Sequence, residues 1–152
     1  MPKLIHTVQR VVNARPEVVF DLLVHPARHC EFDGSDTVRT AVTGPERLAL
    51  GDDFGMGMSN KVNYTSSNRV VEFEEGRRIA WQTGLFRGDK RIFGGQIWRY
   101  ELEGRGDGST LVKETFDLTH ARPAALLSRF VAPATESNMR KTLARLASLF
   151  ER

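Results

Sequence analysis

The stretch PATESNMRKTLARLASLFER, residues 133–152, is the clearest helix signal in the chain. Its apolar residues recur three or four positions apart, which places them on one face of an α-helix. That face comprises Met139, Leu143, Leu146, Ala147 and Phe150. Thr135 and Ser137 are both candidates for the N-cap, and Pro133 suits the first turn. We expect a long C-terminal helix with this face buried.

An apolar face of this size has to be covered by the rest of the chain. The preceding sequence consists mostly of short alternating segments separated by turns with glycine and proline, a pattern typical of strands. We therefore expect an α+β fold in which a curved antiparallel sheet of about seven strands wraps around the C-terminal helix. The pattern leaves open whether sheet and helix form a filled core or enclose a cavity.

The strand pattern recurs along most of the chain. The matching segments span residues 3–12, 37–42, 53–60, 69–74, 78–83, 95–103 and 110–119. After the first of them we expect two short helices, one beginning near Pro16 and the other a turn over residues 27–32. Residues 85–91 combine glycine with several charges, and we expect a loop there.

Length and composition indicate one globular domain, residues 1–152. The chain is 40% hydrophobic, which is enough apolar material for a core. The net charge of +3 comes from scattered basic residues, so we expect no nucleic-acid partner. The single cysteine, Cys30, excludes an internal disulfide and fits a reducing compartment. With no signal-peptide pattern and no apolar run of membrane length, we expect a cytoplasmic protein without stable membrane insertion.

Several segments, taken in order, carry a family likeness. They are residues 16–23, 31–34, 71–81, 98–102 and 110–115, followed by the C-terminal helix. Their order and spacing resemble the START/polyketide-cyclase-like superfamily, also called SRPBCC or helix-grip proteins. The resemblance covers essentially the whole chain and implies a hydrophobic cavity between sheet and helix. It leaves the chemistry open, because the superfamily includes lipid carriers, aromatase/cyclases, dehydratase-like enzymes and binding modules.

Strand alternation, together with the apolar side chains of the C-terminal helical region, identifies the side chains that would face such a cavity. The expected ligand-binding residues are Met56, Met58, Asn60, Tyr64, Trp81, Thr83, Gln96, Trp98, Tyr100, Phe116, Leu127, Phe130, Met139 and Leu143. Aromatic and thioether side chains suit an irregular apolar ligand. Asn60, Tyr64, Thr83 and Gln96 are the polar members that could orient it. The same residues would also fit a filled core.

Glu114 is the most informative single residue. It shares a strand face with Val112, Phe116 and Leu118. A carboxyl group on that face must be paired, hydrogen-bonded or protonated, and burial would raise its pKa. One interpretation is a structural anchor, through a buried salt bridge or a hydrogen bond, for example to an arginine on a neighbouring strand. The other is a catalytic acid or base.

The remaining polar residues give no second type of site. His25 and His29 have a spacing that could present two metal ligands on a helix, but Pro26 interrupts the geometry, so we expect no metal and no cofactor. Cys30 lacks a histidine partner in the pattern and is interpreted as a small apolar residue.

We therefore favour binding of a hydrophobic small molecule, such as a lipid, a polyketide or an isoprenoid. The first alternative is a polyketide cyclase or dehydratase in which Glu114, helped by Tyr64 or Tyr100, moves protons. The second is a protein-interaction module without a ligand. A homodimer is compatible with each of these.

Overall fold

A seven-stranded antiparallel sheet forms the body of the protein. The computed structural model describes residues 3–34, 38–58, 64–87 and 90–151. The strands are β1 (Ile5–Val12), β2 (Val38–Thr43), β3 (Asp53–Met58), β4 (Tyr64–Glu74), β5 (Arg78–Arg87), β6 (Lys90–Gly104) and β7 (Thr110–Asp117). Their order across the sheet is β1-β7-β6-β5-β4-β3-β2. Strands that follow one another in the chain from β2 to β7 are therefore also neighbours in the sheet. Strand β1 pairs with β7 and forms the edge opposite β2.

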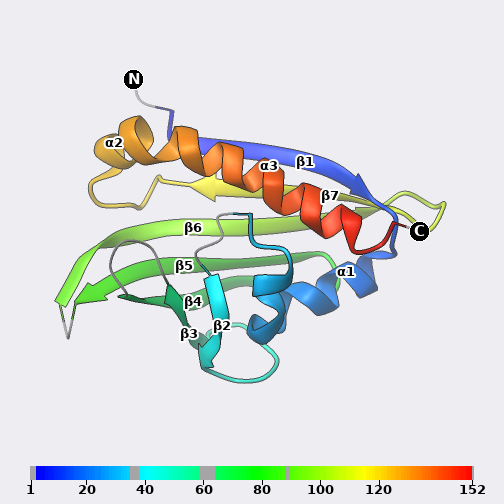
Figure 1. Cartoon of the computed structure of the whole chain (residues 1–152), viewed down its shortest axis with the longest axis horizontal. Helices are drawn as coiled ribbons and strands as arrows, with labels where there is room; N and C mark the ends of the chain where they lie inside the picture. Colours follow the sequence, from blue (N-terminus) through cyan, green and yellow to red (C-terminus); the bar gives the residue numbers. More distant parts are fainter. Residues whose placement is uncertain (1–2, 35–37, 59–63, 88–89, 152) are drawn as a thin grey trace.

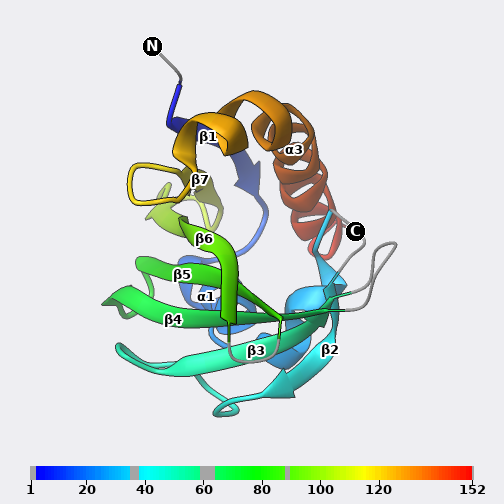
Figure 2. The same cartoon turned by 90° about the vertical axis from the view of Figure 1, so that its left-hand side faces the viewer.

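The helices occupy two places around the sheet (Figure 1). The long helix α3 (Ala132–Ser148) lies along β1 and β7, preceded by the short α2 (Ala124–Leu126) and the π-helical turn η2 (Leu127–Val131). The helices α1 (Pro16–Leu23) and η1 (Pro26–Glu31) follow β1. Figure 2 shows the sheet curling from the β1 edge beside α3 round to β2. The expected helix-grip architecture, with two short helices after the first strand, is confirmed.

The apolar face of α3 is buried as its spacing predicted. Met139, Leu143 and Leu146 are at most 1% exposed, and Phe150 packs partly against the same core. The expected capping is wrong, because neither Thr135 nor Ser137 caps the helix. The chain enters α3 directly from η2, so no free helix start is left to cap. The change from π to α geometry falls at Ala132, one residue before a proline that has no N–H to donate.

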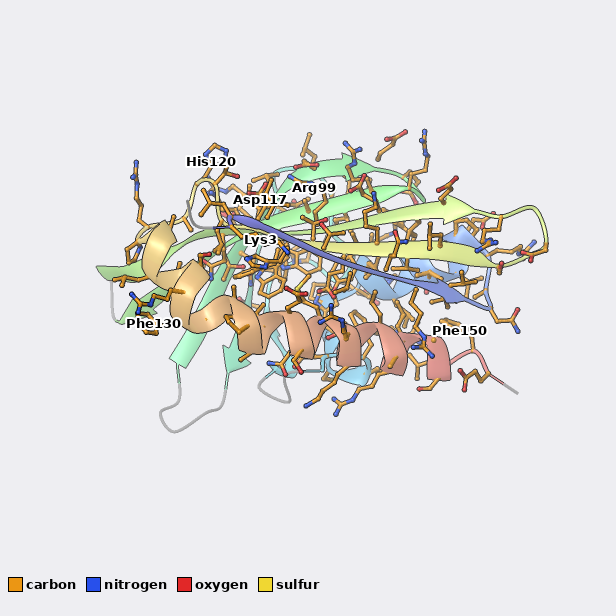
Figure 3. The ribbon with its side chains drawn as sticks, turned by 90° about the horizontal axis from the view of Figure 1, so that it is seen from above. Lys3, Arg99, Asp117, His120, Phe130 and Phe150 are labelled. Carbon is orange, nitrogen blue, oxygen red and sulfur yellow. The ribbon has the colours of Figure 1, made fainter. Side chains whose placement is uncertain are left out.

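The outer face of the sheet is held by a charged cluster. The guanidinium group of Arg99 on β6 donates to both carboxylate oxygens of Glu72 on β4, with the shortest N–O distance at 2.6 Å. Another nitrogen of Arg99 lies 3.6 Å from Asp117 on β7. Figure 3 marks Arg99 and Asp117 on the sheet, away from α3. Since side chains alternate along a strand, Trp98 and Tyr100 point to the opposite, helix-facing side.

The loop expected at residues 85–91 is wrong. Strand β5 continues to Arg87 and β6 begins at Lys90, with Leu85 paired to Phe93 and Phe86 to Arg91. Glycine and charge in this segment indicated a loop, but cross-strand pairing outweighs a local signal of that kind.

The segment after η1 approaches α3 more closely than any side chain would allow. The backbone N–H of Gly34 donates to Thr142 Oγ1 at 2.8 Å. A Cβ atom on Gly34 would lie 2.4 Å from the Asn138 carbonyl oxygen and 2.5 Å from the Thr142 nitrogen. Both neighbours are helix backbone and cannot rotate away. Only glycine therefore allows this contact between the N-terminal half and α3.

We predict that Gly34→Ala lowers stability by roughly 1–3 kcal/mol, because the added methyl group overpacks a backbone contact. Chemical denaturation of the variant measures the loss. Gly104→Ala is the matched control, since its Cβ would approach only the Pro16 side chain, at 3.2 Å. An equal loss in both variants would contradict the proposed contact.

Candidate functional site

The inward face of the sheet carries three rows of side chains that cross several strands. The polar row comprises Asn68, Thr83 and Gln96, which are register partners on β4, β5 and β6. The aromatic row comprises Trp81, Trp98 and Phe116, on β5, β6 and β7. The carboxyl row comprises Ile79, Tyr100 and Glu114, on the same three strands. Neighbouring rows are two residues apart along each strand, a separation of roughly 7 Å.

Glu114 in the carboxyl row is a buried acid with a single protein hydrogen bond. It is 2% exposed, and the Tyr100 hydroxyl donates to its Oε2 at 2.7 Å. Its Oε1 has no hydrogen-bond partner in the described structure. Burial raises the pKa of Glu114 to about 8. The hydrogen bond from Tyr100 lowers this pKa in part, and the nearby Asp33 carboxylate adds to the rise. The carboxyl group is therefore mainly protonated at neutral pH.

The ion pair with an arginine that we considered for Glu114 is wrong. The partner is a tyrosine, and burial together with Glu114 keeps the pKa of that phenol well above its usual value. Because Oε2 accepts the tyrosine hydrogen, Oε1 is the oxygen left to carry the acid's own proton. The site thus presents an O–H donor at Oε1 rather than a charged pair.

His29 extends the aromatic row toward η1 and was missed by sequence analysis as a site residue. Its ring stacks on Trp81 with centroids 5.1 Å apart and meets Phe54 edge-on at 5.9 Å. Its Nε2–H donates to the Leu23 carbonyl oxygen at 2.8 Å, and burial lowers its pKa to about 4. The imidazole is therefore neutral. Pro26, the residue that argued against a metal site, lies at the start of η1. The local sequence around it does not predict that His29 packs on Trp81.

The polar row contains a second residue that the sequence analysis missed. Asn68 is 3% exposed and accepts a hydrogen bond from Thr83 Oγ1 at 2.7 Å. Its own Nδ2 donates to the Phe54 carbonyl oxygen at 3.3 Å. Residues 64–68 are rich in serine, threonine and asparagine, and the strand was expected to begin only at residue 69. Pairing with β3 and β5 extends β4 back to Tyr64.

The other predicted site residues fall into three groups. The structure buries Trp81, Thr83, Gln96, Tyr100, Phe116, Leu127, Met139 and Leu143, and half-buries Trp98. Met56 and Met58 lie on β3 and Tyr64 begins β4, whereas Asn60 lies outside the described residues. Phe130 is 68% exposed and points away from the sheet (Figure 3), so its expected place in the cavity lining is wrong. In the wider π turn of η2, residues three apart no longer share a face, and only Leu127 turns inward.

A surface depression of about 430 Å³ lies elsewhere, at the ends of β4, β5 and β6. Both arginines in its lining are already paired, Arg77 with Glu74 and Arg78 with Glu101. We assign it no ligand, and a cavity between sheet and helix stays a prediction.

Two kinds of feature are absent from the described part of the chain. The described residues hold no group of three or more histidine, cysteine, aspartate or glutamate side chains placed to bind a metal ion. None of the helices in the described ranges has the length and apolar character needed to cross a membrane.

Comparison with known sequences assigns the chain to a protein family. Residues 4–151 match the family described as polyketide cyclase/dehydrase and lipid transport. The chain belongs to this family. Family membership confirms the superfamily predicted from the sequence. The uncharacterized protein Rv0088 of Mycobacterium tuberculosis is a relative, 29% identical over an alignment of 147 residues that covers 93% of this chain. The chain spans only 62% of the length of that relative.

Solved structures share the family fold at low sequence identity. Protein Ms6760 of Mycobacterium smegmatis superimposes with a TM-score of 0.75 at 13% identity, covering 96% of this chain and 90% of its own. The Aha1 dimer of Colwellia psychrerythraea gives a TM-score of 0.70 at 13% identity, covering 98% of this chain and 97% of its own. Identities this low show the fold alone.

We predict that Glu114→Gln removes a pH dependence of stability. Glu114 binds its proton more tightly in the folded state than at its ordinary pKa of 4.5. Its stabilising contribution is therefore complete below about pH 4.5 and is lost as the pH rises to about 8, with a slope of up to about 1.4 kcal/mol per pH unit. Glutamine stays neutral and has no such slope.

Urea denaturation at several pH values from 6.5 to 8 measures this effect. Below that window His29 acts in the opposite sense, because its lowered pKa makes stability rise between about pH 4 and 6.5. We expect the wild type to lose stability relative to Glu114→Gln as the pH rises. Parallel curves for the two proteins would show that Glu114 is not a buried neutral acid.

Proposed function

We propose that the protein binds a hydrophobic small molecule between the inward face of the sheet and α3. The observation that carries this proposal is the buried Glu114 Oε1, which has no hydrogen-bond partner in the described part of the chain and lies one row away from the aromatic side chains. Leaving a buried polar atom unpaired destabilises a folded protein by about 1–3 kcal/mol. Native cores seldom retain such an atom unless a ligand, a water or a function uses it.

The surroundings of Glu114 suit a ligand that is largely apolar. Trp81 contacts Tyr100 at a centroid distance of 5.6 Å, and Trp98 contacts Phe116 at 4.5 Å. Trp98 faces inward yet is only half-buried, which favours access to the aromatic row. A protonated Glu114 would donate from Oε1 to a carbonyl or hydroxyl oxygen of the ligand. Lipids, polyketides and isoprenoids combine an apolar body with such oxygens, and the family description includes lipid transport.

A second candidate function is proton transfer to the bound molecule. It is favoured by one observation, a carboxyl group with a pKa near 8 that is fixed by Tyr100 and shielded from water. A general acid works best when its pKa lies near the working pH. In this interpretation Glu114 protonates a ligand oxygen during cyclisation or dehydration, with Tyr100 holding the carboxyl group in place.

We predict that 8-anilinonaphthalene-1-sulfonate binds the folded protein and is displaced by fatty acids or polycyclic aromatic molecules. A molecule present at about a hundred times its dissociation constant should stabilise the protein by roughly 2.7 kcal/mol, seen as a higher melting temperature. Absence of both dye uptake and thermal stabilisation would contradict the proposed function.

Two variants locate the bound dye. Trp98→Leu removes an aromatic ring from the inward face and should weaken dye binding. Phe130→Ser removes an exposed aromatic ring from η2 and should leave dye binding unchanged. The reverse result would place the dye on the outer surface of η2.

Glu114→Gln separates binding from catalysis. As a proton-transfer residue, Glu114 should be dispensable for binding, while turnover of a polyketide-type substrate falls about 100- to 10,000-fold. As a binding residue, it should affect affinity. Full turnover in the variant would exclude the catalytic role.

A further inference from the structure

The polar row holds a second buried oxygen without a partner. Gln96 is 8% exposed, and its Oε1 makes no hydrogen bond within the described structure. Gln96 lies on β6, whereas Glu114 lies on β7. Gln96 is four residues, or roughly 13 Å along β6, from Tyr100, which is the register partner of Glu114. The unpaired Gln96 Oε1 is therefore an independent observation.

Its two neighbours in the row form a hydrogen-bonded pair. Thr83 Oγ1 donates to Asn68 Oδ1 at 2.7 Å, and Asn68 Nδ2 donates to the Phe54 carbonyl oxygen. The hydroxyl hydrogen of Thr83, the register partner of Gln96, is thus committed to Asn68 rather than to Gln96 Oε1. Gln96 Oε1, on the inward face of the sheet, therefore remains available to accept a hydrogen bond from a bound molecule.

The backbone holds Gln96 in this orientation. Gly94 and Gly95 have φ angles of +148° and +98°, and the register between β5 and β6 shifts at this point. A Cβ on Gly95 would lie 2.5 Å from the His120 carbonyl oxygen, so the bulge is packed tightly against the chain that follows β7. On the outer face, Gln82 Nε2 donates to the Gly95 carbonyl oxygen at 3.0 Å. The residue after the bulge is Gln96, whose side chain is directed inward beside the aromatic row.

We propose that Gln96 Oε1 receives a hydrogen-bond donor, a hydroxyl or N–H group, of the apolar ligand. This inference rests on the proposed function and specifies the class of ligand: an apolar molecule that carries a donor near the polar row while its body lies on the half-buried Trp98. The hydroxyl hydrogen of Thr83, which is donated to Asn68, does not compete for this acceptor.

Matched probes test the inference. One pair is 2-naphthol and 2-fluoronaphthalene, which have similar shapes but differ in the hydroxyl hydrogen. The other pair is 1-decanol and methyl nonyl ether, which have the same number of heavy atoms. We expect the wild type to bind the hydroxyl member of at least one pair roughly three- to tenfold more tightly, the gain typical of one neutral hydrogen bond. Isothermal titration calorimetry measures these affinities directly.

Gln96→Met keeps the side-chain length and removes both polar atoms. This variant should bind the two members of each pair equally, and without ligand it should melt at a higher temperature than the wild type, because the unpaired acceptor is gone. Gln96→Leu replaces it if the methionine variant does not fold. Gln82→Met is the matched control on the outer face: it loses a satisfied hydrogen bond, should melt lower, and should keep the preference for hydroxyl probes.

The outcomes separate this inference from the proposed function. Equal binding of both members of each pair by the wild type, or a preference that survives in Gln96→Met, overturns the inference and leaves the proposed function standing. Binding of no probe by the wild type overturns both. A preference that is lost in Gln96→Met and kept in Gln82→Met supports the inference.

Discussion

Burial of one face of α3 is the constraint on which the rest of the structure depends. Met139, Leu143 and Leu146 need an apolar surface that a single short element cannot provide. The chain supplies it by bringing β1 beside β7, so that its first and last strands meet under the helix. The curl of the remaining strands then turns the inward face of β4, β5 and β6 toward the same interior. Gly34 brings the segment after η1 into contact with the helix from the other side.

The interior created in this way combines features that a purely structural core would not need. Two buried oxygens, Glu114 Oε1 and Gln96 Oε1, have no hydrogen-bond partners in the described structure. Each lowers the stability of the ligand-free protein. The three rows place these oxygens on either side of an aromatic surface. Such an arrangement would favour a molecule with an apolar body and separate polar groups over a simple hydrocarbon.

Electrostatics at the site follow from burial more than from ion pairing. The charged cluster of Arg99, Glu72 and Asp117 lies on the outer face, where the guanidinium group of Arg99 pairs with both carboxylates. On the inner face, Glu114 and His29 are both kept neutral near pH 7, one by a raised pKa and the other by a lowered pKa. A neutral wall accepts an apolar ligand without the cost of desolvating charges. It also leaves Glu114 able to give up a proton.

The sequence by itself determined the fold class, the long C-terminal helix and the inward direction of Glu114, because alternation and helical spacing are local properties of the chain. The burial of Gln96 and Thr83 followed from the same alternation. Only the tertiary structure decided which residues these side chains contact. Glu114 accepts a hydrogen bond from Tyr100 instead of pairing with an arginine, His29 stacks on Trp81, and Thr83 donates to Asn68. Those contacts depend on strand register and on the bulge at Gly94 and Gly95, which bring together residues distant in the sequence. Phe130 shows the same limit, since its direction depends on a π turn that local periodicity does not reveal.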